Sequence, residues 1–116
     1  MNFSQATDEE LWQIADPIMN NLMEGSTEIN HKKHCRDFTQ RMLDIVTPDY
    51  LERVCKKYQS DKGFFSDRTP VAVFRRPESV AFVWKQHFSK AAGDHVAEMV
   101  LVQHEDRLLV DHVMVF

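Results

Sequence analysis

The spacing of apolar residues changes once along this chain, near Gly63, and this change restricts the fold more than any other feature. Before Gly63 the apolar residues recur about every 3.6 positions, which is typical of helices with one buried face. After Gly63 they recur about every second position, which is typical of strands. No Gly/Ser-rich or Pro-rich linker separates the two parts. We therefore expect one α+β domain over residues 1–116, with N-terminal helices packed on a sheet.

The first helix has a clear N-terminal signal, but a proline interrupts its helical pattern. Thr7 and Glu10 have the spacing of a capping box, so we expect the helix to begin there. Pro17 lies inside the helical pattern, and we expect a kink or a restart at that residue. Gly25 is the expected C-terminal stop.

Two further helices are expected before Gly63. Asn30 is a candidate N-cap for a second helix, whose apolar face is marked by Cys35, Phe38, Met42 and Ile45. Thr47 and Pro48 have the order of an N-cap and a first helical residue, so a third helix should start there. Its stripe consists of Leu51, Val54, Cys55 and Tyr58.

Four strands are expected after Gly63, at about 64–75, 79–88, 95–103 and 108–116. The links between them are short, whereas parallel neighbours need crossovers of a dozen or more residues. The strands should therefore form an antiparallel meander, a sheet in which each strand pairs with the next along the chain.

The last hairpin is apolar on both faces if Glu105 and Asp106 form its loop. Strict alternation then gives one face the residues Val96, Glu98, Val100, Val102, Leu109, Asp111, Val113 and Val115. The other face receives Ala97, Met99, Leu101, Leu108, Val110, His112, Met114 and Phe116. In a sheet with one solvent-exposed face, apolar and polar residues should alternate along each strand more regularly than they do here. We therefore expect the second face to be covered by another subunit or by curling of the sheet.

Three helices followed by a bent antiparallel sheet resemble the cystatin-like cone of the nuclear transport factor 2-like (NTF2-like) superfamily. The resemblance runs from about Leu11 to Phe116, through Asp37-Phe38, Thr47–Leu51, Tyr58–Phe64 and the strand residues. It implies a curved four-stranded sheet enclosing a pocket, and a homodimer formed through the outer sheet face. Members include isomerase-like, cyclase-like and dehydratase enzymes as well as non-catalytic binding or assembly domains, so the fold leaves the function open.

The catalytic candidates are three polar residues of the final hairpin: His112, Asp111 and Glu98. Enzymes with this kind of cone use a buried carboxylate to move a proton next to a carbonyl, and Tyr50 or Tyr58 could stabilise the resulting enolate. His112 is expected on the face that carries Met99 and Leu101. A single histidine on an apolar face is more often a core or interface residue than a catalytic one.

The expected ligand pocket is lined by Trp12, Phe82, Trp84, Met99, Leu101, His112 and Met114. For the aromatic residues, a place in the core is the favoured interpretation. His31, His34 and Cys35 lie within one helical turn and are metal-ligand candidates. Only three donors are local, however, and Lys32 and Lys33 are adjacent, so we expect no metal and no cofactor. Cys35 and Cys55 read as small buried hydrophobes, and whether they ever pair stays open.

Charge and composition exclude several classes of function. A net charge of −4 with a pI near 5.8 disfavours nucleic-acid binding. No apolar run approaches the length of a membrane span, and the first ten residues lack the features of a signal peptide, so a soluble, cytoplasmic protein is expected. The sequence thus favours a non-catalytic module for a small apolar ligand or a protein partner. An isomerase, cyclase or dehydratase and a purely structural subunit are the alternatives.

Overall fold

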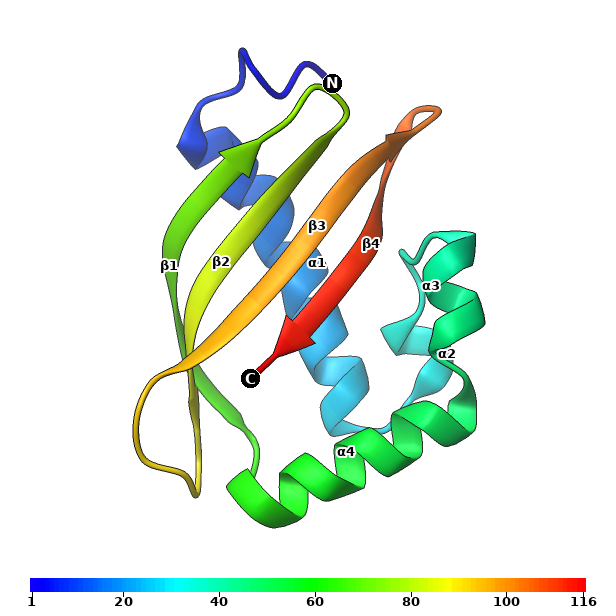
Figure 1. Cartoon of the computed structure of the whole chain (residues 1–116), viewed down its shortest axis with the longest axis vertical. Helices are drawn as coiled ribbons and strands as arrows, with labels where there is room; N and C mark the ends of the chain where they lie inside the picture. The colour runs from blue at the N-terminus through cyan, green and yellow to red at the C-terminus, as the bar shows by residue number, and fades with distance from the viewer.

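The computed structural model describes residues 1–116 and contains four helices followed by four strands (Figure 1). No helix combines the length and the apolar character needed to cross a membrane. The elements are α1 (Asp8–Thr27), α2 (His31–His34), α3 (Gln40–Ile45), α4 (Pro48–Lys62), β1 (Phe65–Arg75), β2 (Ser79–Phe88), β3 (His95–His104) and β4 (Arg107–Val115).

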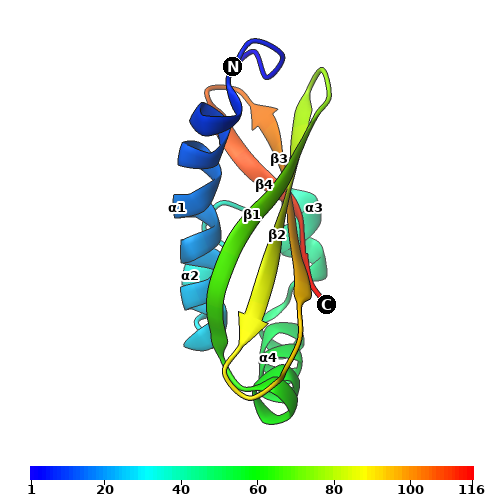
Figure 2. The ribbon, with the colours of Figure 1, turned by 90° about the vertical axis from the view of Figure 1, so that its left-hand side faces the viewer.

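The four strands form one antiparallel sheet in the order β1-β2-β3-β4, which confirms the expected meander. The sheet is curved, and α1 runs along one of its faces while the opposite face carries no helix (Figure 2). α4 lies across one end of the sheet, and α2 and α3 lie beyond β4 (Figure 1). The molecule is thus a two-layer α+β structure with one uncovered sheet face.

Helix α1 begins as expected and ends later than expected. The Thr7 side chain accepts a hydrogen bond from the Glu10 amide, and the Glu10 carboxylate accepts one from the Thr7 amide, so the capping box is present. Pro17 lies inside one helix that does not restart. The prediction that Gly25 ends the helix is wrong, because the helix continues to Thr27. A Cβ atom at Gly25 would lie 2.7 Å from the backbone of His34, so the glycine allows α2 to approach α1 closely.

The second predicted helix is divided into two short ones. Asn30 caps α2 as expected, but this helix ends at His34, and Thr39 caps a separate α3. Phe38, between them, forms a parallel bridge with Val110 of β4. An extended segment therefore interrupts the helical pattern because its backbone groups pair with the sheet, a contact that local periodicity does not contain.

A β-bulge at Asp111 changes the predicted faces of the last hairpin. Leu101 pairs with Val110, whereas Val100 pairs with His112, so Asp111 has no partner residue on β3. One extra residue reverses the alternation beyond it. His112, Met114 and Phe116 therefore lie on the uncovered face, and the prediction that they share a face with Met99 and Leu101 is wrong.

The core lies between α1 and the inner faces of β2 and β3. Trp12 of α1 packs against Phe82 and Trp84 of β2, with ring centroids 5.3 and 5.2 Å away. The Trp84 indole donates a hydrogen bond to the Asp16 carboxylate at 3.3 Å, so the buried ring is not left without a partner. The core also contains fully buried aliphatic residues from three elements: Leu11, Ala15, Met19, Val80, Ala97, Met99 and Leu101.

Candidate functional site

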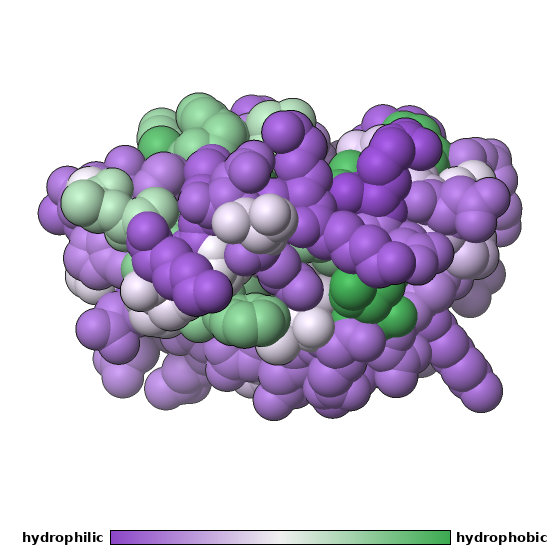
Figure 3. Space-filling model, turned by 90° about the horizontal axis from the view of Figure 1, so that it is seen from below, coloured by the Kyte–Doolittle hydropathy of each residue, from purple (hydrophilic) through white to green (hydrophobic).

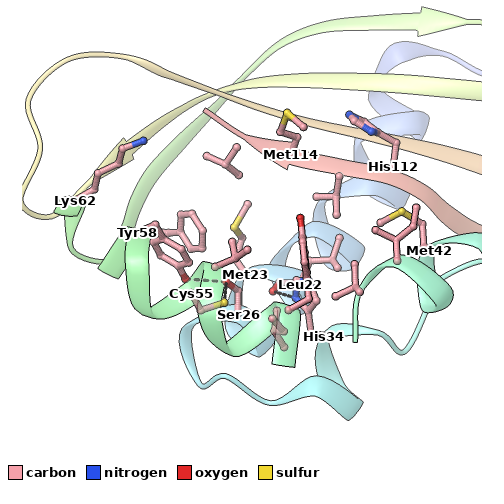
Figure 4. A pocket seen from close by; sticks show the side chains of 18 of the residues that line it. Leu22, Met23, Ser26, His34, Met42, Cys55, Tyr58, Lys62, His112 and Met114 are labelled. Carbon is pink, nitrogen blue, oxygen red and sulfur yellow. Dashed lines mark hydrogen bonds between the residues drawn. The ribbon is translucent and has the colours of Figure 1, made fainter. Parts of the chain in front are cut away.

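An apolar cavity of about 340 Å³ lies between the helices and the end of β4 (Figure 4). Of its 20 lining residues, 15 are hydrophobic. They come from the end of α1, from α2, from α3 with its following loop, from α4 and from three strands: Leu22, Met23, Ser26, His34, Arg41, Met42, Ile45, Val46, Tyr50, Leu51, Val54, Cys55, Tyr58, Lys62, Phe65, Phe88, His112, Val113, Met114 and Val115.

Helix α4 forms one wall of the cavity. Thr47 accepts a hydrogen bond from the Tyr50 amide, Pro48 occupies the first turn and Gly63 forms the C-cap, as the sequence predicts. The apolar stripe of α4 consequently faces β4, with Leu51 and Cys55 buried. The helix lies across the end of the sheet, and Val54 and Tyr58 of its stripe stay partly exposed.

Polar groups at the floor of the cavity are bonded to one another. The Ser26 hydroxyl lies 2.7 Å from the Tyr58 hydroxyl and 3.2 Å from the Cys55 sulfur (Figure 4). Burial raises the pKa values of both the Tyr58 phenol and the Cys55 thiol. Both groups are therefore protonated near pH 7, and Cys55 is not an activated nucleophile.

His34 is a half-buried histidine that lines the cavity. Burial lowers its pKa, and its Nδ1 lies 2.9 Å from the Leu22 carbonyl oxygen. A carbonyl can only accept, so Nδ1 carries the hydrogen and Nε2 keeps its lone pair. His34 is thus a neutral imidazole with one free acceptor nitrogen.

The residues predicted to line the pocket fall into two groups. His112 and Met114 line the cavity. Trp12, Phe82, Trp84, Met99 and Leu101 do not line it, because they pack into the core between α1 and the sheet. The cavity therefore lies beside the aromatic core and not inside it.

Two of the three catalytic candidates, His112 and Glu98, are brought together, and Asp111 has other partners. His112 Nε2 lies 2.8 Å from Glu98 Oε1 on the uncovered sheet face. The bulged Asp111 accepts hydrogen bonds from Thr39 Oγ1 and Arg41 Nε at 2.9 and 3.1 Å. No aspartate or glutamate lines the cavity, and its imidazoles are those of His34 and His112.

The metal-ligand candidates point to separate partners. His31 Nε2 lies 2.7 Å from the Val46 carbonyl oxygen, and His34 bonds Leu22 as described. Cys35 is buried, which raises the pKa of its thiol to about 11. No three potential ligand side chains in the chain converge on one point. Cys35 and Cys55 are both free thiols.

Apolar side chains continue from the cavity to the surface. Ile45, Tyr50, Val54 and Met114 line the cavity and are 38–50% exposed. Seen from the α4 end, hydrophobic areas interrupt an otherwise hydrophilic surface (Figure 3). The cavity is therefore open, and its rim offers apolar contacts to whatever enters.

Sequence reasoning missed most of this site for an identifiable reason. The apolar stripes of α1 and α4 were correctly recognised as buried, but a stripe does not reveal whether the space that it faces is filled. Leu22, Met23 and Ser26 look the same in sequence whether they contact side chains or an open volume. Tyr58 was identified only as a possible hydrogen-bond donor, and His34 only as a possible metal ligand.

Comparison with known proteins supports the fold alone. No protein-family model matches the chain, and no curated protein sequence matches it. Among solved structures, a designed NTF2-like protein, a variant of Rd1NTF2_05, is similar with a TM-score of 0.66 and 12% identity over 90% of this chain and 97% of the other. Bdellovibrio bacteriovorus Bd1075 gives 0.53 with 6% identity over 89% of this chain and 39% of that protein. A DUF4783 family protein from Bacteroides ovatus gives 0.50 with 7% identity over 82% of this chain and 90% of that protein. The chain therefore has the NTF2-like fold, as its helix-to-sheet order predicted.

Proposed function

We propose that this protein is a non-catalytic binding module whose cavity holds an apolar ligand. The observation that carries the proposal is the open apolar cavity of about 340 Å³ that contains no carboxylate. This volume lies at the lower end of the range of ligand pockets, which is roughly 300–1,000 Å³. Ser26 and Tyr58 supply a few polar contacts in an otherwise apolar lining, as ligand pockets usually do.

The experiment is a thermal-shift screen with a library of apolar metabolites. A ligand that binds only the native state at about 100 times its Kd stabilises that state by about 2.7 kcal/mol. Val54→Trp should fill the mouth of the cavity and abolish the shift. Val71→Trp is the matched control, because Val71 is 61% exposed on β1 and does not line the cavity. A flat screen, or hits that stabilise the Val54→Trp variant as much as the wild type, would refute the proposal.

We also propose that two copies associate through the uncovered sheet face. This face carries the partly buried side chains of Val83, Val100 and Leu109. It also carries Phe74 and Phe116, which are each 54% exposed. These apolar side chains surround the Glu98–His112 pair on the same face, and exposed apolar groups of this kind are typical of an association surface. Sedimentation should give a dimer at tens of micromolar, and Val100→Glu should give a monomer, whereas Gln13→Glu on α1 should leave the dimer intact. A wild-type monomer at that concentration would overturn this part of the proposal.

The alternative function is proton transfer within the same cavity. The observation that favours it is the neutral His34 imidazole, whose free Nε2 could act as a base, with Tyr58 as a hydrogen-bond donor. A base of this kind would exchange the proton next to a ligand carbonyl with solvent. Deuterium incorporation into a bound ketone that is lost in His34→Gln would favour the enzyme, and binding without exchange would favour the module.

A further inference from the structure

The edge of β4 beside the cavity carries backbone groups that have no partner. β4 is the last strand of the sheet, so one of its sides is unpaired. Phe116 exchanges both backbone hydrogen bonds with Val96, at 2.7 and 2.8 Å. In an antiparallel pair the bonded residues alternate, so Met114 also faces β3 while Val113 and Val115 direct their N–H and C=O groups outward. The backbone N–H and C=O groups of Val113 and Val115 form no hydrogen bond with any segment outside the sheet.

Further along the same edge, the chain itself supplies an extended partner. The Val110 amide donates to the Asp37 carbonyl at 2.7 Å, and the Thr39 amide donates to the Val110 carbonyl at 3.0 Å. Arg41 Nη2 then donates to the Asp111 carbonyl. The chain turns into α3 after this point, and the edge at Val113 is open to the cavity. The Asp37–Thr39 segment shows that the fold accepts a single extended chain beside β4.

The open edge and the apolar cavity are parts of one site. Val113 and Val115 line the cavity together with Leu51, Val54 and Tyr58 of α4. A rigid apolar ligand would fill this volume and leave the edge amides and carbonyls without partners, which is costly for buried polar groups. An extended peptide satisfies them, and its alternate side chains would enter the apolar volume.

We infer that the cavity binds an extended, apolar segment of another protein, which adds to the sheet by pairing with the backbone of Val113 and Val115. This inference rests on the proposed binding function and names the class of ligand. The free edge spans about three residues, or roughly 10 Å of strand. Of the charged lining residues, Arg41 already pairs with Asp111 whereas Lys62 forms no ion pair, so a flanking acidic residue suits the site better than a basic one. A second copy of this chain would bring its whole sheet against α3 and α4, which lie beyond this edge (Figure 1).

The probe is a display library of random linear peptides selected against the whole protein. Selected peptides should carry apolar residues at alternate positions. After synthesis, they should slow hydrogen exchange at the Val113 and Val115 amides at least about tenfold. Methylating the alternate backbone nitrogens that pair with β4 should weaken binding about tenfold, since each removes a hydrogen bond. Methylation of the intervening nitrogens is the matched control.

Val115→Pro tests the same edge from the protein side. Its N–H points away from β3, so proline removes an edge donor and leaves the ladder intact. Val115→Pro should weaken the peptide about tenfold, whereas Val115→Ala, which keeps the amide, should weaken it much less. The methylated peptides give the same information on the wild-type protein if the proline variant folds poorly.

Three results would overturn the inference. One is a selection without enrichment over the bare support, and another is a set of peptides that leave the exchange of Val113 and Val115 unchanged. The third is a wild-type dimer that Val115→Pro dissociates, because the edge would then pair with a second copy. A metabolite that stabilises the wild type but not Val54→Trp would leave the binding function standing when the peptide experiment fails.

Discussion

Replacing Gly25 by alanine should destabilise the protein, although the same change in an exposed helix is favourable. Gly25 lies in the last turns of α1 with helical backbone angles, where alanine is favoured by about 1 kcal/mol. A Cβ atom there would lie 2.7 Å from both the backbone nitrogen and the Cα of His34, whereas ordinary contact begins at 3.4 Å. The two helices would have to separate by about 0.7 Å, the difference between these distances.

The contacts around Gly25 oppose that separation. The Asn21 side chain donates to the Lys33 carbonyl at 2.9 Å, the Asn30 amide donates to the Gly25 carbonyl at 2.8 Å, and His34 bonds Leu22. The clash is with backbone atoms, which cannot change rotamer, so we take the upper part of the overpacking cost of about 1–3 kcal/mol. Subtracting the gain in helix propensity leaves a net loss of about 1–2 kcal/mol.

Urea denaturation followed by circular dichroism measures this loss as a lower midpoint with an unchanged slope. The matched control is the pair Gln13→Ala and Gln13→Gly. Because Gln13 is exposed in the same helix, the difference in unfolding free energy between these two variants measures the preference of α1 for alanine over glycine without a clash. A Gly25→Ala variant at least as stable as the wild type would contradict the expected loss. A gain in stability equal to the difference between Gln13→Ala and Gln13→Gly would show that α1 and α2 are not in tight contact.

Four further predictions concern titration, thiol reactivity and capping. Burial lowers the pKa of His34 below 6.5, so the unfolded chain binds the proton more readily than the folded protein. The free energy of unfolding should therefore fall as the pH drops through 6.5. The urea midpoints at pH 5 and pH 7 should differ less in His34→Gln than in the wild type. Burial raises the pKa of Cys35 from 9.0 to about 11, so the unfolded chain releases its proton first and stability should fall as the pH rises through that range. In the native protein at pH 8, Cys35 should react with a thiol reagent far more slowly than in denaturant, and equal rates would contradict its burial. Thr47→Ala should cost about 1 kcal/mol by removing the α4 cap, and an unchanged urea midpoint would show that the cap is not needed.

The sequence predicted those parts of the fold that are determined by local chemistry. The Thr7–Glu10 capping box, the Thr47-Pro48 start of α4 and the Gly63 cap depend on residues within a few positions of one another. The antiparallel meander follows from short links, which are equally local. These elements were predicted within a residue or two of their observed bounds.

The parts that were missed depend on contacts between distant residues. Hydrogen bonds from Thr39 and Arg41, some seventy positions earlier in the chain, stabilise the bulge at Asp111. The periodicity of apolar residues in β4 does not predict this bulge. The neighbouring bridge between Phe38 and Val110 interrupts the second helix. The misplaced faces of the hairpin and the broken helix thus both arise where the 37–41 segment meets β4.

The cavity could not be predicted for a related reason. Its walls are the stripes of α1 and α4 and the edge of β4, each of which was recognised as apolar from the sequence. The open volume depends on how far α4 lies from β4, and that distance is set by the whole arrangement of α2, α3 and the bulged strand. Periodicity identifies which face of a helix is buried, but not what lies opposite that face.

The bridge between Phe38 and Val110 also has a consequence for the order of folding. Each strand of the meander pairs with its neighbour in sequence, so the sheet can form by closing short loops in succession. The bridge closes a loop of more than seventy residues, at an entropic cost that grows with loop length. We expect α2 and α3 to dock after the transition state, so that Phe38→Leu accelerates unfolding, leaves the folding rate unchanged and gives a φ-value near zero in stopped-flow experiments. A φ-value near one would place this contact in the nucleus. If it docks late, the cavity closes only in the final step of folding, and the edge of β4 stays exposed until then.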